Sequence, residues 1–329
     1  MQDNKLFILE KLRNYMLSED ETWQKTIAFA EYKNPWFTKP FIHAAIQAIT
    51  NHYLDKKSLE SYATLFSTQQ QEDKIVGITM AGNIPLVGFH DFLSVFLSPF
   101  RISIKLSQKD DILLPHLISK LIDWDATLSK KISIQSLLKN CDAYIATGSH
   151  ASSLYFKQYF EKYPHIIREN KTSIALLDGT ESNEELLALA DDIFMYYGLG
   201  CRNVTKIYVP QSYNFENLIL QFKKYDDLKN HNKYRNNYDY QLALYLLNNI
   251  QYMCNENVLL VENESDYSPV SVLHYSFYED KQTLIQSLQQ KTHLQTIVGH
   301  NFTPFGMAQN PSLTDFADGI NTVEFLNSI

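Results

Sequence analysis

The stretch KIVGITMAGNIPLVGFHDFLSVFLSPFRISIKL, residues 74–106, indicates the fold class of this chain. A β-branched run at 75–80 predicts a strand, a turn leads into a helical pattern at 86–97, and a second β-branched run at 102–106 predicts another strand. Strand–helix–strand units of this kind build a parallel sheet that is covered by helices. We therefore expect an α/β protein.

The same alternation of short strands and longer helices continues towards the C-terminus. Further strands are predicted at residues 143–146, 173–177, 206–209, 258–261 and 271–278. Further helices are predicted at residues 112–122, 152–163, 182–197, 215–225, 239–249 and 281–289. Residues 1–70 are expected to be mostly helical, the polar tract at 67–73 to be a linker or loop, and the charged run at 223–240 to be a solvated face or a surface loop.

Length, charge and cysteine count exclude several classes of protein. With 329 residues the chain is long enough for two domains, and its formal net charge of −8 argues against a basic nucleic-acid-binding surface. Cys141, Cys201 and Cys254 form no CxxC pair, which argues against a disulfide framework and a cysteine zinc site. The GxGxxG, P-loop, GxSxG and HExxH fingerprints are absent. Because neither a signal-peptide pattern nor an apolar stretch of about 18 residues occurs, we expect a cytoplasmic protein without a membrane span. We also expect no metal, because the cysteine zinc and HExxH patterns are missing.

Cys201, in the sequence YGLGCRNVTK at 197–206, is a candidate nucleophile. Two glycines allow a sharp turn between the end of a predicted helix and the start of a strand, so the thiol can lie at a cleft. Arg202 and Lys206 are placed where positive charge would favour the thiolate. The alternative interpretation is a small buried residue in a glycine turn.

Asn83, in the sequence TMAGNIPL at 79–86, is a candidate oxyanion-binding residue. It follows a predicted strand, at the edge of an open α/β sheet where ligands bind, and its side-chain amide can donate a hydrogen bond to a developing oxyanion. Pro85 suits the first turn of the helix that follows. The alternative is an ordinary turn asparagine with a left-handed backbone.

Two further motifs suggest a site for a phosphate-containing cofactor. Thr147, Gly148 and Ser149 follow a predicted strand and open a helix, where free N–H groups and the helix dipole favour a phosphate. Lys105, near the end of another strand, can contact a ribose or a ribose phosphate. The alternatives are an ordinary helix N-cap and a solvated strand end.

Together these motifs resemble the aldehyde dehydrogenase superfamily, and more specifically the LuxC-type family of bacterial fatty acyl-CoA reductases, whose best-known members supply long-chain aldehyde to luciferase. The resemblance extends from about residue 82 to the C-terminus. The matching stretches are GNIPLVGFHDFLSVFLSPFRISIKLSQKD (82–110), ATGSHAS (146–152), RENKTSIALLDG (168–179), FMYYGLGCRNVTKIYVP (194–210) and FGMAQNPSLTDFADGINTVEFL (305–326). The resemblance implies an aldehyde-dehydrogenase-like fold with a Rossmann-like cofactor domain and an α/β catalytic domain.

The resemblance also implies roles for the candidate residues. Asn83 matches the asparagine of the family's Asn-x-Pro turn, which helps to form the oxyanion hole, and Cys201 matches the nucleophile. Lys105 matches the lysine that contacts the adenosine ribose of the cofactor, and the turn at 147–149 matches the segment that cradles the pyrophosphate.

Two positions depart from the pattern of the dehydrogenases. The glutamate that activates water for hydrolysis of the acyl-enzyme is replaced by Ile167, with Glu169 out of register, and this favours reduction over aldehyde oxidation. The glutamate that holds the nicotinamide ribose falls on Ser265, with Glu264 one residue away, so we assign that role to no residue.

The resemblance implies an acyl-CoA reductase that reduces a long-chain fatty acyl thioester to the aldehyde through an acyl-Cys201 intermediate and releases CoA. It favours NADPH as the cofactor, with NADH as the other possibility. Residues 1–172 with 300–329 are expected to form the cofactor domain, and residues 173–299 the catalytic domain. The expected partners are acyl-CoA or an acyl carrier, an acyl-protein synthetase or acyltransferase, and further copies of the chain.

Two other functions remain open at this point. A cysteine acyltransferase or thioesterase would keep Cys201 and Asn83 but need no dinucleotide. A non-catalytic subunit of an acyl-transfer complex would keep the fold alone, because fold does not establish function.

Overall fold

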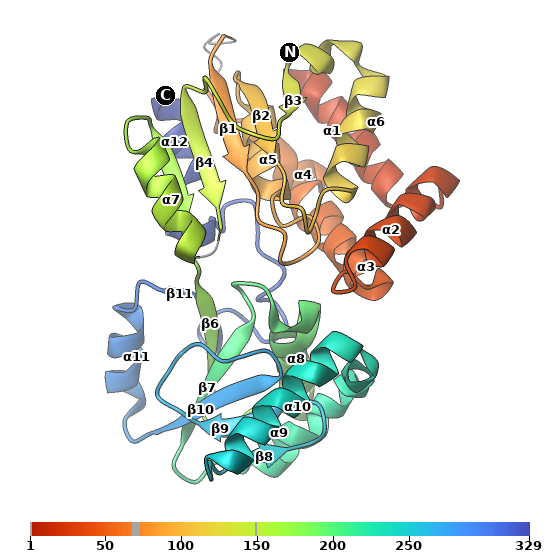
Figure 1. The fold of residues 1–329 in the computed structure, drawn as a ribbon. Coiled ribbons are helices and arrows are strands. Elements are labelled where there is room, and N and C mark those ends of the chain that lie inside the picture. Colours follow the sequence, from red (N-terminus) through yellow and green to blue (C-terminus); the bar gives the residue numbers. More distant parts are fainter. Residues whose placement is uncertain (1, 68–72, 149) are drawn as a thin grey trace. The chain divides into compact units, whose positions relative to one another are not determined.

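The computed structural model describes residues 2–67, 73–148 and 150–329, and the chain divides into two compact units (Figure 1). The first unit comprises Met1–Asn170 and Pro311–Ile329, and the second comprises Lys171–Asn310. Each unit contains a largely parallel sheet with helices packed on it, so the predicted α/β class is confirmed.

The first unit begins with four helices, as the sequence predicts. They are α1 (Gln2–Met16), α2 (Glu21–Lys33), α3 (Lys39–Ala48) and α4 (Lys56–Ala63). The Asp20 carboxylate accepts hydrogen bonds from two N–H groups in the first turn of α2, and the Asp55 carboxylate caps α4 by accepting the N–H of Ser58. These helices bury Leu9, Leu12 and Trp23 completely in the core that they share with the sheet.

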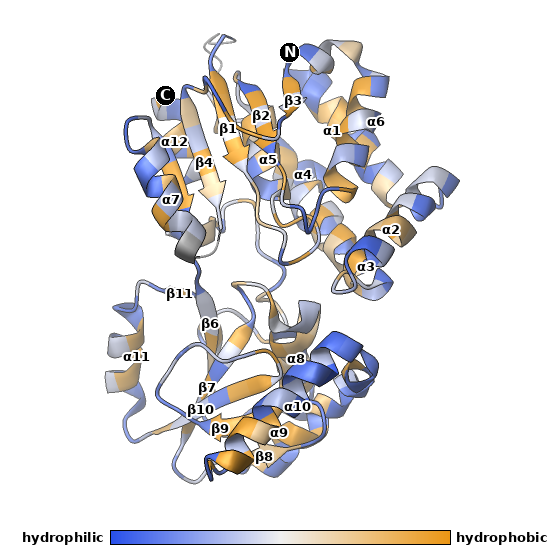
Figure 2. Ribbon diagram, viewed as in Figure 1, coloured by the Kyte–Doolittle hydropathy of each residue, from blue (hydrophilic) through white to orange (hydrophobic). Residues whose placement is uncertain are grey.

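The sheet of the first unit is entirely parallel, with the strand order β3-β2-β1-β4-β5. Its strands are β1 (Ile75–Thr79), β2 (Arg101–Lys105), β3 (Ile132–Ile134), β4 (Ala143–Thr147) and β5 (His165–Arg168). The crossover and C-terminal helices are α5 (Phe89–Leu97), α6 (Leu113–Trp124), α7 (His150–Phe160) and α12 (Thr322–Ser328). The order reverses at β1, so right-handed crossovers put α7 on the opposite face from α5 and α6. Figure 2 shows the apolar strands and the apolar face of α5 at the centre of this unit.

The second unit contains a six-stranded sheet with the order β11-β6-β7-β10-β9-β8, in which only β8 is antiparallel to its neighbour. Its strands are β6 (Thr172–Leu176), β7 (Val204–Pro210), β8 (Met253–Cys254), β9 (Leu259–Glu262), β10 (Val272–Tyr278) and β11 (Leu294–Gly299). Its helices are α8 (Asn183–Phe194), α9 (Phe215–Gln221), α10 (Asn232–Leu247) and α11 (Lys281–Gln289). Ser182 and Glu185 form the reciprocal hydrogen bonds of a capping box at the start of α8.

Some helix bounds differ from those predicted. The helix predicted from residue 86 begins at Phe89, because Leu86 has a left-handed backbone with φ of 57°. The run at 223–240 is mostly exposed or half-buried, but it is helical rather than a loop: it forms a 3₁₀ segment, Phe222–Asn230, and most of α10, and it buries Tyr234 and Tyr238.

The segment 300–310, which we expected in the cofactor domain, lies in the second unit. The carboxylate of Asp192 in α8 accepts the N–H groups of Gly306 and Ala308 at 2.6 and 2.9 Å, and this fixes the segment to α8. Asp192 is fully buried, and burial raises its pKa to about 7 although both hydrogen bonds oppose the shift. Within the described ranges, no helix is long and apolar enough to span a membrane.

Candidate active site

Three of the predicted site residues gather at one edge of the first unit's sheet. Lys105 ends β2, Thr147 ends β4, and Asn83 lies in the turn that follows β1, the strand between them. Thr79 at the end of β1 pairs directly with Lys105. Because these strands are parallel, their carboxyl ends meet at the same edge, and the strand order reverses between β1 and β4. Ligands of open α/β sheets bind beside such a reversal.

The Asn83 turn is packed tightly against the turn at 107–110. A Cβ atom on Gly82 would lie 2.6 Å from Oγ of Ser107, 2.8 Å from its Cβ and 3.1 Å from the Asp110 nitrogen, so only glycine fits there. The Asp110 carboxylate accepts the N–H of Leu86 at 2.8 Å and so holds the left-handed residue that precedes α5. Neither contact could be read from the local sequence, since both join segments about 25 residues apart.

Replacing Gly82 with alanine is expected to lower the free energy of unfolding of the first unit by about 1–3 kcal/mol, the usual cost of overpacking. The Ser107→Gly change removes both clashing atoms, so it should restore most of the loss in the double variant. Urea denaturation followed by tryptophan fluorescence measures this, because all three tryptophans are in the first unit (Trp23, Trp36 and Trp124). Equal loss with and without Ser107→Gly would contradict the steric explanation.

The buried Asp110 also makes stability depend on pH. Burial raises its pKa to about 7, against the opposing hydrogen bond from Leu86, so the folded state binds a proton that the unfolded state releases between about pH 4 and 7. The free energy of unfolding should therefore fall as pH rises through this range, by up to about 1.4 kcal/mol per pH unit from this group. Asp110→Asn should flatten the urea-midpoint profile between pH 5 and 8, whereas parallel profiles would contradict the assignment.

The candidate pyrophosphate turn is compatible with close approach of a ligand. Thr147 is half-buried at the end of β4, and a Cβ atom on Gly148 would lie 2.8 Å from Cβ of Ser152 and 2.9 Å from Cε2 of Phe156. Glycine is therefore needed between β4 and α7, and its bare backbone is what a phosphate at a helix start requires. Ser149 lies outside the described residues. Lys105 is half-buried and forms no ion pair within the described part of the chain, so it fits a role in contacting a ligand.

Cys201 lies in the second unit, in the turn between α8 and β7, and its side chain is partly exposed. The Asn203 N–H donates to the Gly200 carbonyl at 3.1 Å and closes the turn, and Ser173 Oγ donates to the Cys201 carbonyl at 3.1 Å. Of the three cysteines, Cys141 is buried and Cys254 is exposed on the edge strand β8. Cys201 is thus partly exposed, and hydrogen bonds hold the backbone of its turn.

One of the two cations proposed to favour the thiolate is engaged elsewhere. Lys206 is completely buried, and its ammonium group donates to the Glu264 carbonyl at 2.9 Å and lies 4.0 Å from the Asp266 carboxylate. Burial lowers the pKa of Lys206, although Asp266 opposes the shift. The alternation of side chains along strand β7 could not reveal this ion pair, because Asp266 comes from the distant loop between β9 and β10. Arg202 is half-buried beside Cys201 in the chain.

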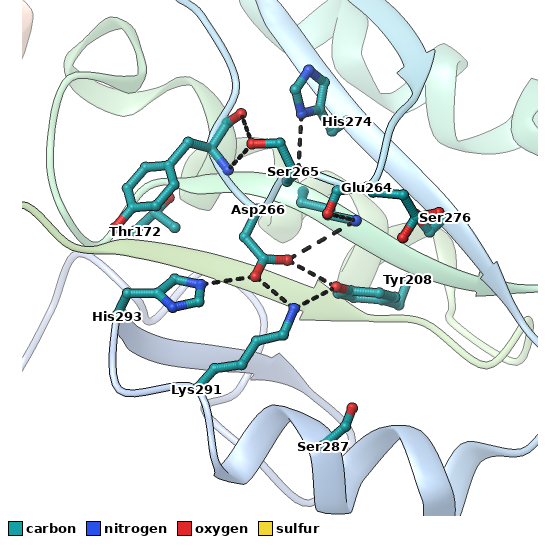
Figure 3. Close-up of polar contacts among 12 residues, drawn as sticks. Thr172, Tyr208, Glu264, Ser265, Asp266, His274, Ser276, Ser287, Lys291 and His293 are labelled. Carbon is teal, nitrogen blue, oxygen red and sulfur yellow. Dashed lines mark hydrogen bonds and ion pairs between the residues drawn. The ribbon is translucent and has the colours of Figure 1, made fainter.

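In the loop between β9 and β10, the carboxylate of Asp266 faces inward. Figure 3 shows Tyr208, Lys291 and His293 directed at it, and their hydrogen bonds measure 2.8, 2.6 and 2.8 Å. Burial opposes ionisation, but these bonds lower the pKa of Asp266 overall. The Asp266 carbonyl accepts from Thr205 at the start of β7, so the loop is tied to the strand that follows Cys201.

Glu264 and Ser265, the two residues considered for the nicotinamide ribose, are not held by a network like that of Asp266. Glu264 is exposed, and Oγ of Ser265 donates to the Tyr267 carbonyl at 2.9 Å within the loop. At the position of the missing general base, Ile167 lies within β5, and Glu169 forms an ion pair with Lys157.

A pocket of about 390 Å³ lies at the opposite end of α8 from Cys201. Its lining comes from the first turns of α8 and from the segment after β11, and it comprises Glu184, Glu185, Ala188, Gly299, His300, Asn301, Phe302, Pro304 and Phe305. His300 bridges Asp178 and Glu185 at 3.2 and 3.0 Å, and these hydrogen bonds raise its pKa. His300 thus joins the residue that follows β6 closely to the first turn of α8.

The fold is that of the aldehyde dehydrogenases. Aldehyde dehydrogenase 21 of Physcomitrella patens, solved with the reaction product succinate, has a TM-score of 0.71 and 10% identity, covering 100% of this chain and 84% of that chain. The aldehyde dehydrogenase of Mycobacterium tuberculosis complexed with NAD+ has a TM-score of 0.63 and 14% identity, covering 87% of this chain and 70% of that chain. At such identities the similarity defines the fold alone.

The family follows from the sequence comparison. The model of the acyl-CoA reductase (LuxC) family matches residues 41–299, so the chain belongs to that family and the resemblance drawn from its motifs is confirmed. Long-chain acyl-protein thioester reductase 2 of Photobacterium leiognathi is 26% identical in an alignment 168 residues long that covers 45% of this chain and 35% of that relative. The match thus spans about a third of the relative's length.

Proposed function

We propose that the protein reduces a long-chain fatty acyl thioester to the aldehyde, with NADPH as the reductant and Cys201 as the covalent nucleophile. The observation that carries the proposal is the family match over residues 41–299, which includes the accessible Cys201 in its closed turn. The name of the Photobacterium relative, a thioester reductase, supports the same reaction class.

In the proposed reaction the Cys201 thiolate attacks the thioester carbonyl, a new C–S bond forms, and the carrier thiolate leaves and takes up a proton. The Cys201 backbone N–H and the Asn83 amide are proposed to donate hydrogen bonds to the oxyanion of the tetrahedral intermediate. Each donor of this kind is typically worth about 10²–10³ in rate. Transfer to a thiolate keeps the acyl group activated for reduction.

The first unit is proposed to bind the cofactor, and the second to carry the nucleophile. The turn at 147–149 would hold the pyrophosphate and Lys105 the adenosine ribose or its phosphate, at the edge where the sheet order reverses. A bound nicotinamide supplies the hydride that reduces the acyl group. The NAD+ complexes among proteins of the same fold support a nicotinamide cofactor, and NADPH rather than NADH is our proposal.

The absence of a glutamate at residue 167 supports reduction rather than hydrolysis. Ile167 has no group that can activate water, and the Glu169 carboxylate forms an ion pair with Lys157. An acyl-enzyme that is not attacked by water persists long enough to receive a hydride.

The test is to mix the protein with acyl-CoAs of increasing chain length and follow loss of reduced-cofactor absorbance, with NADPH and NADH compared. An acylated carrier protein serves as a second donor, since the Photobacterium relative is named for a protein-bound acyl group. Cofactor oxidation that depends on acyl donor and yields aldehyde supports the proposal. CoA release that needs no reduced cofactor would instead indicate an acyltransferase or thioesterase, and no turnover with either donor would contradict the proposal.

A further inference from the structure

We propose that Asn203 is the positioning residue of the nucleophile: its side chain holds the reversed backbone that sets the direction of Cys201. This inference rests on the proposed function, in which Cys201 attacks a thioester. It assigns a role to a residue that the motifs did not single out.

The backbone between α8 and Cys201 adopts a left-handed conformation, unlike the right-handed helix that precedes it. Tyr196 and Tyr197 have φ of 55° and 59°, and Gly198 has φ of 73°. A left-handed conformation costs a residue with a side chain roughly 1–2 kcal/mol. Two adjacent tyrosines in this conformation therefore need support from their surroundings, and strain of this kind persists only where other contacts determine it.

Part of that support comes from the two tyrosine rings. Both residues are buried, with 4% of each exposed. The Tyr197 ring lies 4.4 Å from the His231 ring and 5.7 Å from the Tyr234 ring, measured between centroids. Packing fixes the side chains, but it leaves the carbonyl groups at the end of α8 without the hydrogen bonds that a continuing helix would provide.

The Asn203 amide supplies those hydrogen bonds. Its Nδ2 group donates to the carbonyls of Asp192, Ile193 and Met195 at 3.0, 3.2 and 2.9 Å. Its Oδ1 atom accepts the N–H of Gly200 at 2.8 Å, on the other side of the reversed segment. Asn203 is completely buried, so water cannot replace these contacts.

One side chain thus joins the end of α8 to the residue immediately before Cys201. The Asn203 backbone closes the turn from the other side, by donating to the Gly200 carbonyl and accepting the Ser173 N–H at 3.3 Å. With the Cys201 carbonyl also bound by Ser173, the orientation of the Cys201 peptide is fixed at both ends. The helix-to-strand turn acts as a rigid elbow for the nucleophile.

This arrangement affects acyl transfer more than the intrinsic reactivity of the thiol. Attack on a thioester requires the thiolate and the Cys201 N–H to meet one carbonyl group in a defined geometry, and a displacement of about 1 Å costs on the order of 10²-fold. Alkylation by iodoacetamide uses no oxyanion donor, so it reports the thiolate alone. The two rates should therefore separate when the elbow loosens.

The test compares Asn203→Ala and Asn203→Asp with Asn257→Ala, all in a Cys254→Ser background so that alkylation reports Cys201. Asn257 is a matched control, because it is also completely buried in the second unit, but its amide binds Asp226. Asn203→Asp keeps the acceptor for Gly200 and places a carboxylate opposite three carbonyls, so it should be at least as harmful as alanine. Hydrogen exchange of residues 195–203 reports the elbow without any substrate.

Both Asn203 variants are expected to slow single-turnover acylation by about 10²-fold, to change alkylation by less than about threefold, and to speed exchange in residues 195–203. Asn257→Ala should change none of these three rates selectively. If hydrogen exchange of residues 195–203 is unchanged in the Asn203 variants, then Asn203 does not hold the turn. If exchange is faster but the acylation rate is unchanged, then Asn203 does not position the nucleophile. A parent protein that is alkylated at Cys201 but never acylated would contradict the proposed function instead, and the positioning role would fall with it.

Discussion

The Cys201→Ser variant is expected to lose acyl-dependent NADPH oxidation by on the order of 10⁴- to 10⁶-fold, the usual result of removing a covalent nucleophile. A serine hydroxyl is almost entirely protonated at neutral pH, and it needs an adjacent base to attack a carbonyl. In the second unit the Asp192 carboxylate accepts the N–H of Gly306, and the Asp266 carboxylate binds Lys291 and lies 4.0 Å from the ammonium group of Lys206, so these three groups are engaged elsewhere. The loss is measured as initial rates of cofactor oxidation, together with mass spectrometry of the acyl-enzyme.

The matched control is Cys254→Ser, which changes the other accessible thiol of the second unit. It should keep the activity of the parent protein, and Cys201→Ser should still bind NADPH with unchanged affinity, because the proposed cofactor residues lie in the first unit. An active serine variant, or equal losses in the two variants, would show that Cys201 is not the nucleophile.

The sequence predicts the edge of the first sheet well because strand ends are marked locally. The β-branched runs that become β1, β2 and β4 are bounded by glycine, proline and polar residues, so the strand ends at Thr79, Lys105 and Thr147 could be placed within a residue or two. Once those strands are parallel neighbours, the grouping of Asn83, Lys105 and Thr147 follows from topology. The motifs locate this part of the candidate site before any side-chain contact is known.

The contacts that hold the candidate site could not be predicted, because each joins distant parts of the chain. Asp110 reaches Leu86, and Asp192 reaches Gly306, through side chains whose type alone suggests exposure. Asn203 lies two residues after Cys201 in the sequence, but its hydrogen-bond partners depend on the left-handed backbone at Tyr196. Local patterns identify the reacting groups, whereas tertiary packing decides what positions them.

In the charged run at 223–240, composition did not reveal which side chains are buried. Its lysines and asparagines do face solvent in part, but two of its tyrosines, Tyr234 and Tyr238, are almost fully buried. Tyr234 donates its hydroxyl to the Asn257 carbonyl at 2.8 Å, which satisfies the one polar group that burial would otherwise penalise. A polar sequence can therefore cover a core when its aromatic residues recur at helical spacing, as these do at i and i+4.

Replacing Arg168 with methionine is expected to lower the free energy of unfolding of the first unit by about 3–5 kcal/mol, because it leaves a buried carboxylate without its cation. Arg168 ends β5 with 3% of its surface exposed, and its guanidinium group donates to the Asp91 carboxylate at 2.7 and 3.3 Å. It also donates to the Ala317 carbonyl at 2.6 Å and to Thr322 at 2.8 Å, so it joins α5 to the C-terminal segment.

The pH dependence of this loss distinguishes a broken ion pair from lost packing. Burial alone would raise the pKa of Asp91, but the charge and hydrogen bonds of Arg168 outweigh it and lower the pKa. Without Arg168 the pKa of Asp91 should rise, so the variant can bind a proton on folding and its deficit should shrink as pH falls from 8 to 5. Urea denaturation followed by tryptophan fluorescence measures both quantities.

Lys33→Met is the matched control, since it breaks a second ion pair of the first unit at the surface. Lys33 and Asp111 lie 2.6 Å apart with side chains 42% and 31% exposed, and an exposed pair of this kind contributes at most about 1 kcal/mol. Asp91→Asn combined with Arg168→Met should recover part of the lost stability, because the uncompensated charge is gone. If the double variant is no more stable than Arg168→Met, and the deficit is the same at pH 5 and pH 8, then the contacts of Arg168 with Ala317 and Thr322, rather than its charge, hold the C-terminal segment on α5.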